Sequence, residues 1–273
     1  MANLARVNIL LLTIFAIIVA GQPINDDDIT PDARKDGRIV GGYEVDITRH
    51  PHQVAMRRKG CEACSYTHHC GGSIYNEWVI VTAAHCVNGR KKEDFIVVAG
   101  TVVRNGVIGV VARISEIIMH DKYNLTITDY DVALLILATP LPLNAITMSP
   151  IELASEIPPH GAKATISGWG TTSPGGDKPI QMLAVDVPIV SNERCDSAYG
   201  PGRISDAMLC AGLEGVGGKD ACQGYSGGPL VVNGKLTGIV SWGYGCARPA
   251  FPGVYANVPH VRQWILDTAA ANV

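Results

Sequence analysis

Short apolar runs separated by turn residues dominate the chain from Ile39 onward. β-Branched residues are concentrated in "WVIVTAA", "FIVVAG", "VIGVVARI", "VALLIL", "KATISGWG", "LAVDVPIV", "PLVVNGKLTGIVSWG" and "GVYANV". Runs of this length, bounded by Gly, Pro, Asn and Asp, are typical of strands in sandwiches and barrels. The pattern therefore predicts an all-β protein.

One segment near the C-terminus has the period of a helix instead. In "HVRQWILDTAA", residues 260–270, the side chains of Val261, Trp264, Ile265 and Thr268 fall on one face. We predict a C-terminal helix there. The sequence contains no fixed-period repeat.

The beginning of the chain has a different pattern. Arg6 precedes the apolar run "ILLLTIFAIIVA" at residues 9–20, and polar residues follow it at once. The run is short for a membrane span, which needs about 20 apolar residues. We interpret residues 1–21 as a secretory signal peptide cleaved after Gly21, in preference to a membrane anchor.

The next segment, "QPINDDDITPDARKDGR" at residues 22–38, is acidic and contains proline. Such a composition does not form a core and is typical of a flexible pro-segment. It ends in Arg38, which precedes the apolar "IVGG" beginning at Ile39. We therefore predict an activation pro-segment over 22–38 and a mature domain over 39–273.

Composition narrows the class of partner. The 273 residues are 47% hydrophobic with a net charge of −3, and the basic residues form no long run. A general nucleic-acid surface is therefore not expected. The length allows one large β domain or two small ones. We expect no membrane attachment after signal removal.

Secretion changes how the eight cysteines are interpreted. An even number in a secreted chain favours disulfides, although the sequence alone leaves the pairing open. Cys61 and Cys64 lie close to His68 and His69, a pattern that fits either a zinc site or a small local disulfide. We favour the disulfide. Asn124 begins a glycosylation sequon, which in a secreted protein indicates an exposed loop.

Three short segments carry residues suited to nucleophilic catalysis. "VTAAHC" contains His85, "DYDVALLIL" contains Asp131, and "CQGYSGGP" contains Ser226. A serine hydroxyl needs a base to take its proton, and histidine titrates near neutrality. A buried carboxylate would hold the correct imidazole tautomer. Glycines around the serine let backbone N–H groups approach an oxyanion, and here Gly224 and Ser226 would supply them.

Together with "RIVGG", "GWG" and "SWGYGCARPAFPGVY", these segments resemble the trypsin-like serine proteases of the chymotrypsin fold over about residues 39–267. "GIVSWGYGCAR" and "GKDACQG" are similar to arthropod, mite-type digestive trypsins. The resemblance implies two six-stranded antiparallel β-barrels with the site between them. It implies His85 as general base, Asp131 as its orienting partner and Ser226 as nucleophile.

The same resemblance implies a specificity pocket and a set of disulfides. Asp220 would form the floor of the pocket and select Lys or Arg, Gly243 and Gly253 would keep its walls open, and the backbone of Ser241, Trp242 and Gly243 would hold the substrate strand. The implied disulfides are Cys70–Cys86, Cys195–Cys210 and Cys222–Cys246. Some relatives bind calcium through carboxylates at the position of residues 100–114, which contain no acidic residue here, so we expect no calcium.

Tyr225 departs from the family pattern, which has an aspartate there. In the family that aspartate pairs with the amino group freed by activation, here that of Ile39. A phenol lacks the counter-charge, and leaving one member of a buried pair unpaired costs about 3–5 kcal/mol. The loop is then either trapped in a zymogen-like state or blocks the pocket with its ring, or it adapts and retains reduced activity.

We therefore predict a secreted serine endopeptidase, activated at Arg38–Ile39 by another protease, that cleaves after Lys or Arg through an acyl-enzyme. It would act without cofactor or metal, as a monomer, on polypeptide substrates, and would meet protein inhibitors. The alternative is an impaired protease paralogue, like the inactivated mite serine proteases, that binds macromolecules without turnover. A lipase or esterase is set aside because the Gly-x-Ser-x-Gly elbow needs a strand–turn–helix setting and an Asp-before-His order.

Overall fold

The structure is a computed structural model that describes residues 42–171, 176–217, 224–246 and 248–273. These residues fall within one compact unit, Gly37–Val273. The predicted signal peptide and pro-segment, with Arg38 and Ile39, lie outside the described residues. Within the described ranges, no helix has both the length and the apolar character needed to cross a membrane.

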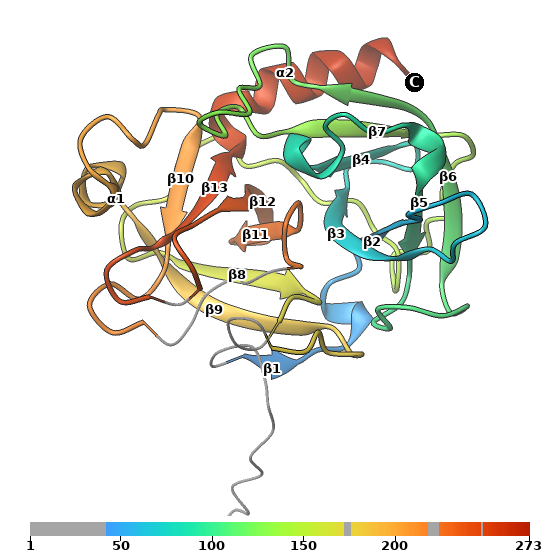
Figure 1. Cartoon of the computed structure of the whole chain (residues 1–273), viewed down its shortest axis with the longest axis horizontal. Coiled ribbons are helices and arrows are strands. Elements are labelled where there is room, and N and C mark those ends of the chain that lie inside the picture. Colours follow the sequence, from blue (N-terminus) through green and yellow to red (C-terminus); the bar gives the residue numbers. More distant parts are fainter. Residues whose placement is uncertain (1–41, 172–175, 218–223, 247) are drawn as a thin grey trace, which may run out of the picture. The chain divides into compact units, whose positions relative to one another are not determined.

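The N-terminal half of the described chain forms a closed barrel of antiparallel strands in the order β2-β3-β4-β7-β6-β5 (Figure 1). The strands are β2 (Gln53–Arg58), β3 (Thr67–Ile74), β4 (Val79–Thr82), β5 (Phe95–Ala99), β6 (Val110–Met119) and β7 (Ala133–Leu137). Every residue of β4, β5 and β7 is buried, so these strands read as continuous apolar runs rather than alternating ones.

The C-terminal half forms a second closed barrel. Its sheet runs β1-β9-β10-β13-β12-β11-β8, and pairing of β8 with β9 closes six of the strands while β1 adds to the outside of β9. The strands are β1 (Tyr43–Glu44), β8 (Lys163–Gly168), β9 (Leu183–Val190), β10 (Met208–Ala211), β11 (Pro229–Val232), β12 (Lys235–Trp242) and β13 (Gly253–Asn257). The predicted architecture of two six-stranded barrels is confirmed.

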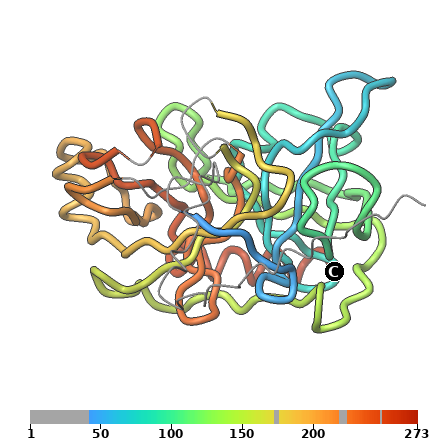
Figure 2. Tube along the Cα trace, turned by 90° about the horizontal axis from the view of Figure 1, so that it is seen from below, coloured from blue at the N-terminus to red at the C-terminus, as the bar shows by residue number. Residues whose placement is uncertain are grey.

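The two barrels lie side by side, with most of the blue-to-teal segments on the right and most of the orange segments on the left of the second view (Figure 2). Backbone and side-chain hydrogen bonds join them at buried positions. The N–H of Gly71 on β3 donates to the carbonyl of Ser226 at 2.8 Å, and the Ser167 hydroxyl on β8 donates to Gln53 Oε1 on β2 at 2.7 Å. These contacts place the loop before β11 against the first barrel.

The predicted C-terminal helix is α2 (Val258–Ala271). Val261 and Ile265 are buried as expected, whereas Thr268 is only half-buried and Ala269 completes the buried face. A second helix, α1 (Asn192–Tyr199), was not predicted from the sequence. It has a weak apolar period because, apart from Cys195 and Tyr199, none of its residues is buried.

The described residues include single-turn 3-10 helices at Ile47–Arg49, Ala84–Cys86 and Lys92–Asp94. The one at Ala84–Cys86 follows β4 at once and carries His85. The strands β1, β2, β3 and β10 were not among the predicted runs. In β3 the sequence "THHCGGSI" has few β-branched residues, because Gly71 lies against the backbone of Gly228, and Gly72 against Ile80, too closely for a Cβ.

Candidate active site

Asp131 is a buried carboxylate that receives three hydrogen bonds. The backbone N–H of His85 donates to Oδ1 at 2.8 Å, and His85 Nδ1 lies 2.7 Å from Oδ2. The hydroxyl of Ser241, at the end of β12, donates to Oδ2 at 2.5 Å. Asp131 is 1% exposed while the His85 side chain is 27% exposed, so the carboxylate is enclosed and the imidazole faces the opening.

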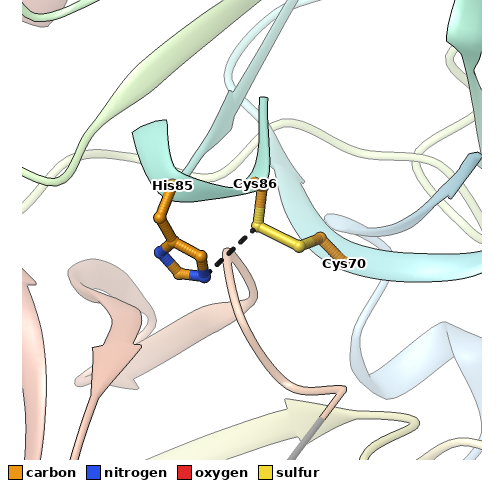
Figure 3. A group of neighbouring side chains, drawn as sticks. All are labelled: Cys70, His85 and Cys86. Atoms are coloured by element: carbon orange, nitrogen blue, oxygen red, sulfur yellow. Dashed lines mark hydrogen bonds between the residues drawn. A yellow bond between two sulfur atoms is a disulfide. The ribbon is translucent and has the colours of Figure 1, made fainter. Parts of the chain in front are cut away.

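This geometry selects one tautomer of His85. A carboxylate only accepts hydrogen bonds, so Nδ1 carries the proton in the neutral imidazole and Nε2 keeps its lone pair. Figure 3 shows Nε2 directed toward the sulfur of Cys86 at 3.7 Å. That sulfur is in a disulfide and has no proton to donate, so Nε2 stays available as a proton acceptor.

His85, Cys70 and Cys86 bring potential metal-ligand atoms within 4.8 Å of one another. Cys70 and Cys86 are bonded to each other, however, with an S–S distance of 2.05 Å (Figure 3). Metal binding by cysteine requires the thiolate. The group is therefore a disulfide beside the imidazole and has no thiolate ligand for a metal.

The loop that carries Ser226 packs against the end of β4, where a Cβ on Gly227 would come too close to Thr82 Oγ1. Besides the bond from Gly71 to the Ser226 carbonyl, the Gly227 N–H donates to Val240 O and the Gly228 N–H donates to Tyr225 O, both at 2.8 Å. Ser226 thus lies next to the strand that leads into His85. Within the described residues no hydrogen bond joins Ser226 Oγ to His85, and such bonds often tighten only when substrate is present.

Tyr225 directs its ring away from the opening and into the second barrel. The side chain is 1% exposed and belongs to the apolar cluster formed by β8, β9, β10, β11, β12 and β13. Its ring lies against Gly168, where a Cβ would come within 2.9 Å of Cδ1. The hydroxyl is buried without a hydrogen-bond partner, and burial raises the pKa of Tyr225 well above its usual value.

The position of this ring bears on the sequence-based hypotheses about Tyr225. The ring packs among the buried side chains of the second barrel, which gives no support to the hypothesis that it blocks the pocket. Gly168 makes this packing possible because it leaves the ring's volume free. A zymogen-like loop and an adapted loop stay as the two other predictions.

His68 on β3 links the first barrel to the same loop. Its Nε2 lies 2.9 Å from the carbonyl oxygen of Gly224, so Nε2 carries the proton and donates. Burial lowers the pKa of His68 to about 4, which keeps the ring neutral near pH 7. Its Nδ1 is buried without a partner.

The predicted oxyanion donors are the backbone N–H groups of Gly224 and Ser226. Among the described residues, neither donates a backbone hydrogen bond. Gly224 has a φ of +106°, a conformation that glycine adopts readily. Both N–H groups therefore stay candidates for binding an oxyanion.

The predicted pocket walls also converge. A Cβ on Gly243 would lie 3.9 Å from the Cα of Gly253, so side chains at either position would enter the space between them. Trp242 is half-buried beside Gly243. Asp220, the predicted floor, and Cys222, the predicted partner of Cys246, lie outside the described residues.

Three disulfides join described cysteines: Cys61–Cys64, Cys70–Cys86 and Cys195–Cys210. The preference for a local Cys61–Cys64 disulfide over zinc is confirmed. Asn124 is exposed, as a sequon in a surface loop would be. The contribution of the Ser241 hydroxyl to Asp131 was missed, because nothing in "IVSWG" distinguishes this serine from an ordinary strand residue.

Comparisons with known proteins agree with this arrangement. A family model described as Trypsin matches residues 39–265. The chain is 51% identical over 256 residues to Trypsin zeta of Drosophila melanogaster, covering 91% of both chains. It is 53% identical over 234 residues to Trypsin eta of Drosophila erecta, covering 85% of this chain and 90% of the relative. Hypodermin-B of Hypoderma lineatum is 48% identical over 237 residues, covering 86% and 88%.

Proposed function

We propose, on the premise that the chain belongs to the trypsin family of serine endopeptidases, that this protein is a secreted, competent endopeptidase that cleaves after Lys or Arg. It is made as a zymogen and activated between Arg38 and Ile39. The observation that carries the proposal is the His85–Asp131 pair, in which a buried, triply hydrogen-bonded carboxylate holds the imidazole with Nε2 free.

In this mechanism His85 Nε2 takes the hydroxyl proton of Ser226 as Oγ attacks the carbonyl carbon of the scissile bond. The oxyanion accepts hydrogen bonds from the N–H groups of Gly224 and Ser226. Asp131 stabilises the imidazolium, which then gives its proton to the leaving amine. Water repeats the sequence on the acyl-enzyme and regenerates Ser226.

We assign the selection of Lys or Arg to Asp220, which the family resemblance makes the floor of a slot with Gly243 and Gly253 as its walls. A carboxylate at the end of a narrow slot favours a long cationic side chain because it supplies the missing counter-charge. No cofactor takes part in any of these steps.

The experiment compares small amides that carry Arg, Leu or Glu before the cleaved bond, with protein cleaved after Arg38. We expect hydrolysis of the Arg amide alone and none by a Ser226→Ala control. Equal rates on the Leu and Arg amides would remove the proposed specificity while leaving the peptidase function intact.

A second candidate is a protease scaffold that binds macromolecular targets with little turnover. It is favoured by one observation, the absence of a charge on the buried Tyr225 hydroxyl. If the natural protein fails to hydrolyse the Arg amide and a Tyr225→Asp variant succeeds, this second function replaces the first. Similar rates for the two proteins support the endopeptidase.

A further inference from the structure

Positive charge accumulates beside Gly224. The half-buried side chain of Lys178 crosses this residue, with Cε 3.1 Å from the position that a Cβ on Gly224 would take. Arg104 is held next to it, since Arg104 Nε donates to Pro179 O at 2.9 Å and its backbone N–H donates to Ile180 O at 2.9 Å. Burial, followed by the charge of Arg104, lowers the pKa of Lys178.

The described residues give these two cations no acidic partner. Within the part of the chain that the structure describes, neither Lys178 nor Arg104 forms an ion pair, whereas Lys163 pairs with Asp186 and Lys235 with Glu152. The charged groups that act on His68 and His69 from this side are also basic, namely Lys178, Arg104 and Arg58. Partly buried cations without counter-ions are unfavourable in the free protein and favour a ligand with negative charge.

The contacts of His85 indicate on which side of the cleaved bond Lys178 and Arg104 lie. This residue must protonate the leaving amine through Nε2, which faces the Cys70–Cys86 disulfide. Strand β3 connects this disulfide with the loop that contains Gly224. His69 Nε2 on β3 lies 2.9 Å from Cys86 O, and His68 Nε2 on β3 lies 2.9 Å from Gly224 O. Ser241, at the end of β12, donates to Asp131 instead, and the family resemblance assigns the acyl portion of the substrate to this strand.

We propose that Lys178 and Arg104 bind an acidic side chain of the substrate on the leaving-group side, within two residues after the cleaved bond. The inference rests on the proposed endopeptidase function and adds a preference to it. Lys178 supplies a charge that the carboxylate reaches beside Gly224, and Arg104 raises the local positive potential. Both are partly exposed, so added salt weakens the preference.

The test uses two peptides with the same acyl portion ending in Arg, and with Asp or Asn at the second position after the cleaved bond. We expect the wild-type protein, cleaved after Arg38, to show a kcat/KM for the Asp peptide about three- to tenfold higher, as a contact between partly exposed charges would give. Lys178→Gln should reduce the ratio to about one to two. Lys163→Gln, which removes a lysine on β8 that has its own carboxylate, should leave the ratio unchanged.

A small Arg amide without residues after the cleaved bond separates the possible failures. If wild-type protein does not hydrolyse it, the endopeptidase function fails, and the Kd values of a Ser226→Ala protein for the two peptides then test the preference without turnover. The Asp and Asn peptides are compared with the variable residue at the first and then at the second position after the cleaved bond. Equal kcat/KM values, or equal Kd values, at both positions would overturn the inference alone. A ratio that survives in Lys178→Gln would also overturn it.

Discussion

In the first barrel, His85 is held by hydrogen bonds to the buried carboxylate of Asp131. In the second barrel, Ser226 follows a tyrosine whose ring packs in an apolar core. The first arrangement is polar and directional, with three donors aimed at Asp131. The second depends on the volume and burial of one ring, whose hydroxyl has no partner. In the proposed function, two different kinds of interaction would therefore orient the catalytic residues.

If the proposed function holds, the difference teaches that loop order and charge pairing are separable requirements. A buried ion pair orients a loop but has a large desolvation penalty, and apolar replacements of similar volume are often equally stable. Tyr225 occupies the barrel core with its own apolar surface and needs no charged partner there. What it lacks is a hydrogen bond for its hydroxyl.

The largest effect is expected from breaking the hydrogen bonds between His85 and Asp131. Asp131→Asn should reduce kcat for an Arg amide by about 10⁴-fold, the size known for triads of this kind, because the amide favours the wrong imidazole tautomer. Steady-state kinetics measure it. Asp121→Asn, at a carboxylate that is 79% exposed, serves as the control and should leave kcat close to wild type.

The next largest effect is expected from removing the apolar packing of the Tyr225 ring. Tyr225→Ala should lower the free energy of unfolding by about 3–5 kcal/mol, the usual result of truncating a buried aromatic ring. Tyr225→Phe should raise it by about 1 kcal/mol, because it removes a buried hydroxyl that has no partner. Denaturant unfolding of the uncleaved chain measures both. A loss of stability in Tyr225→Phe would mean that the hydroxyl is bonded.

A smaller effect is expected from His68, which joins the first barrel to the loop that carries Ser226. The pKa of His68 is about 4 in the folded protein and near 6.5 when unfolded, so the unfolded state binds more protons between these values. The free energy of unfolding should fall as the pH drops from 6.5 to 4, by about 3 kcal/mol from this residue.

Denaturant unfolding at several pH values measures the contribution of His68, with His68→Gln as the test variant and His160→Gln, at an exposed histidine, as the control. The His68 variant should lose part of the pH dependence and the control should not. Equal slopes in all three proteins would show that His68 is protonated in the folded state.

Much of this architecture was predictable from the sequence, and the reasons are local. β5 and β7 are continuous apolar runs bounded by turn residues, so the sequence predicts both strands. β3 escaped prediction because its glycines are required by close backbone approach, and α1 because it buries so few side chains. Such requirements come from tertiary contacts and leave no period in the sequence.

The candidate site shows the same division. His85, Asp131 and Ser226 stand in distinctive segments and were identified from them. The Ser241 hydroxyl and the direction of the Tyr225 ring depend on how β12 and β8 pack against these segments. The sequence could identify Tyr225 as unusual, but only the space beside Gly168 shows where its ring goes.

The most direct test of the central claim, that Tyr225 orders the nucleophile loop from inside the barrel, is an active-site titration. Protein cleaved after Arg38 is reacted with an ester that acylates an active serine and releases a chromophore in a burst. We predict a burst close to one equivalent for the wild type and for Tyr225→Phe. A wild type without a burst, beside a Tyr225→Asp variant with a full one, would contradict the account.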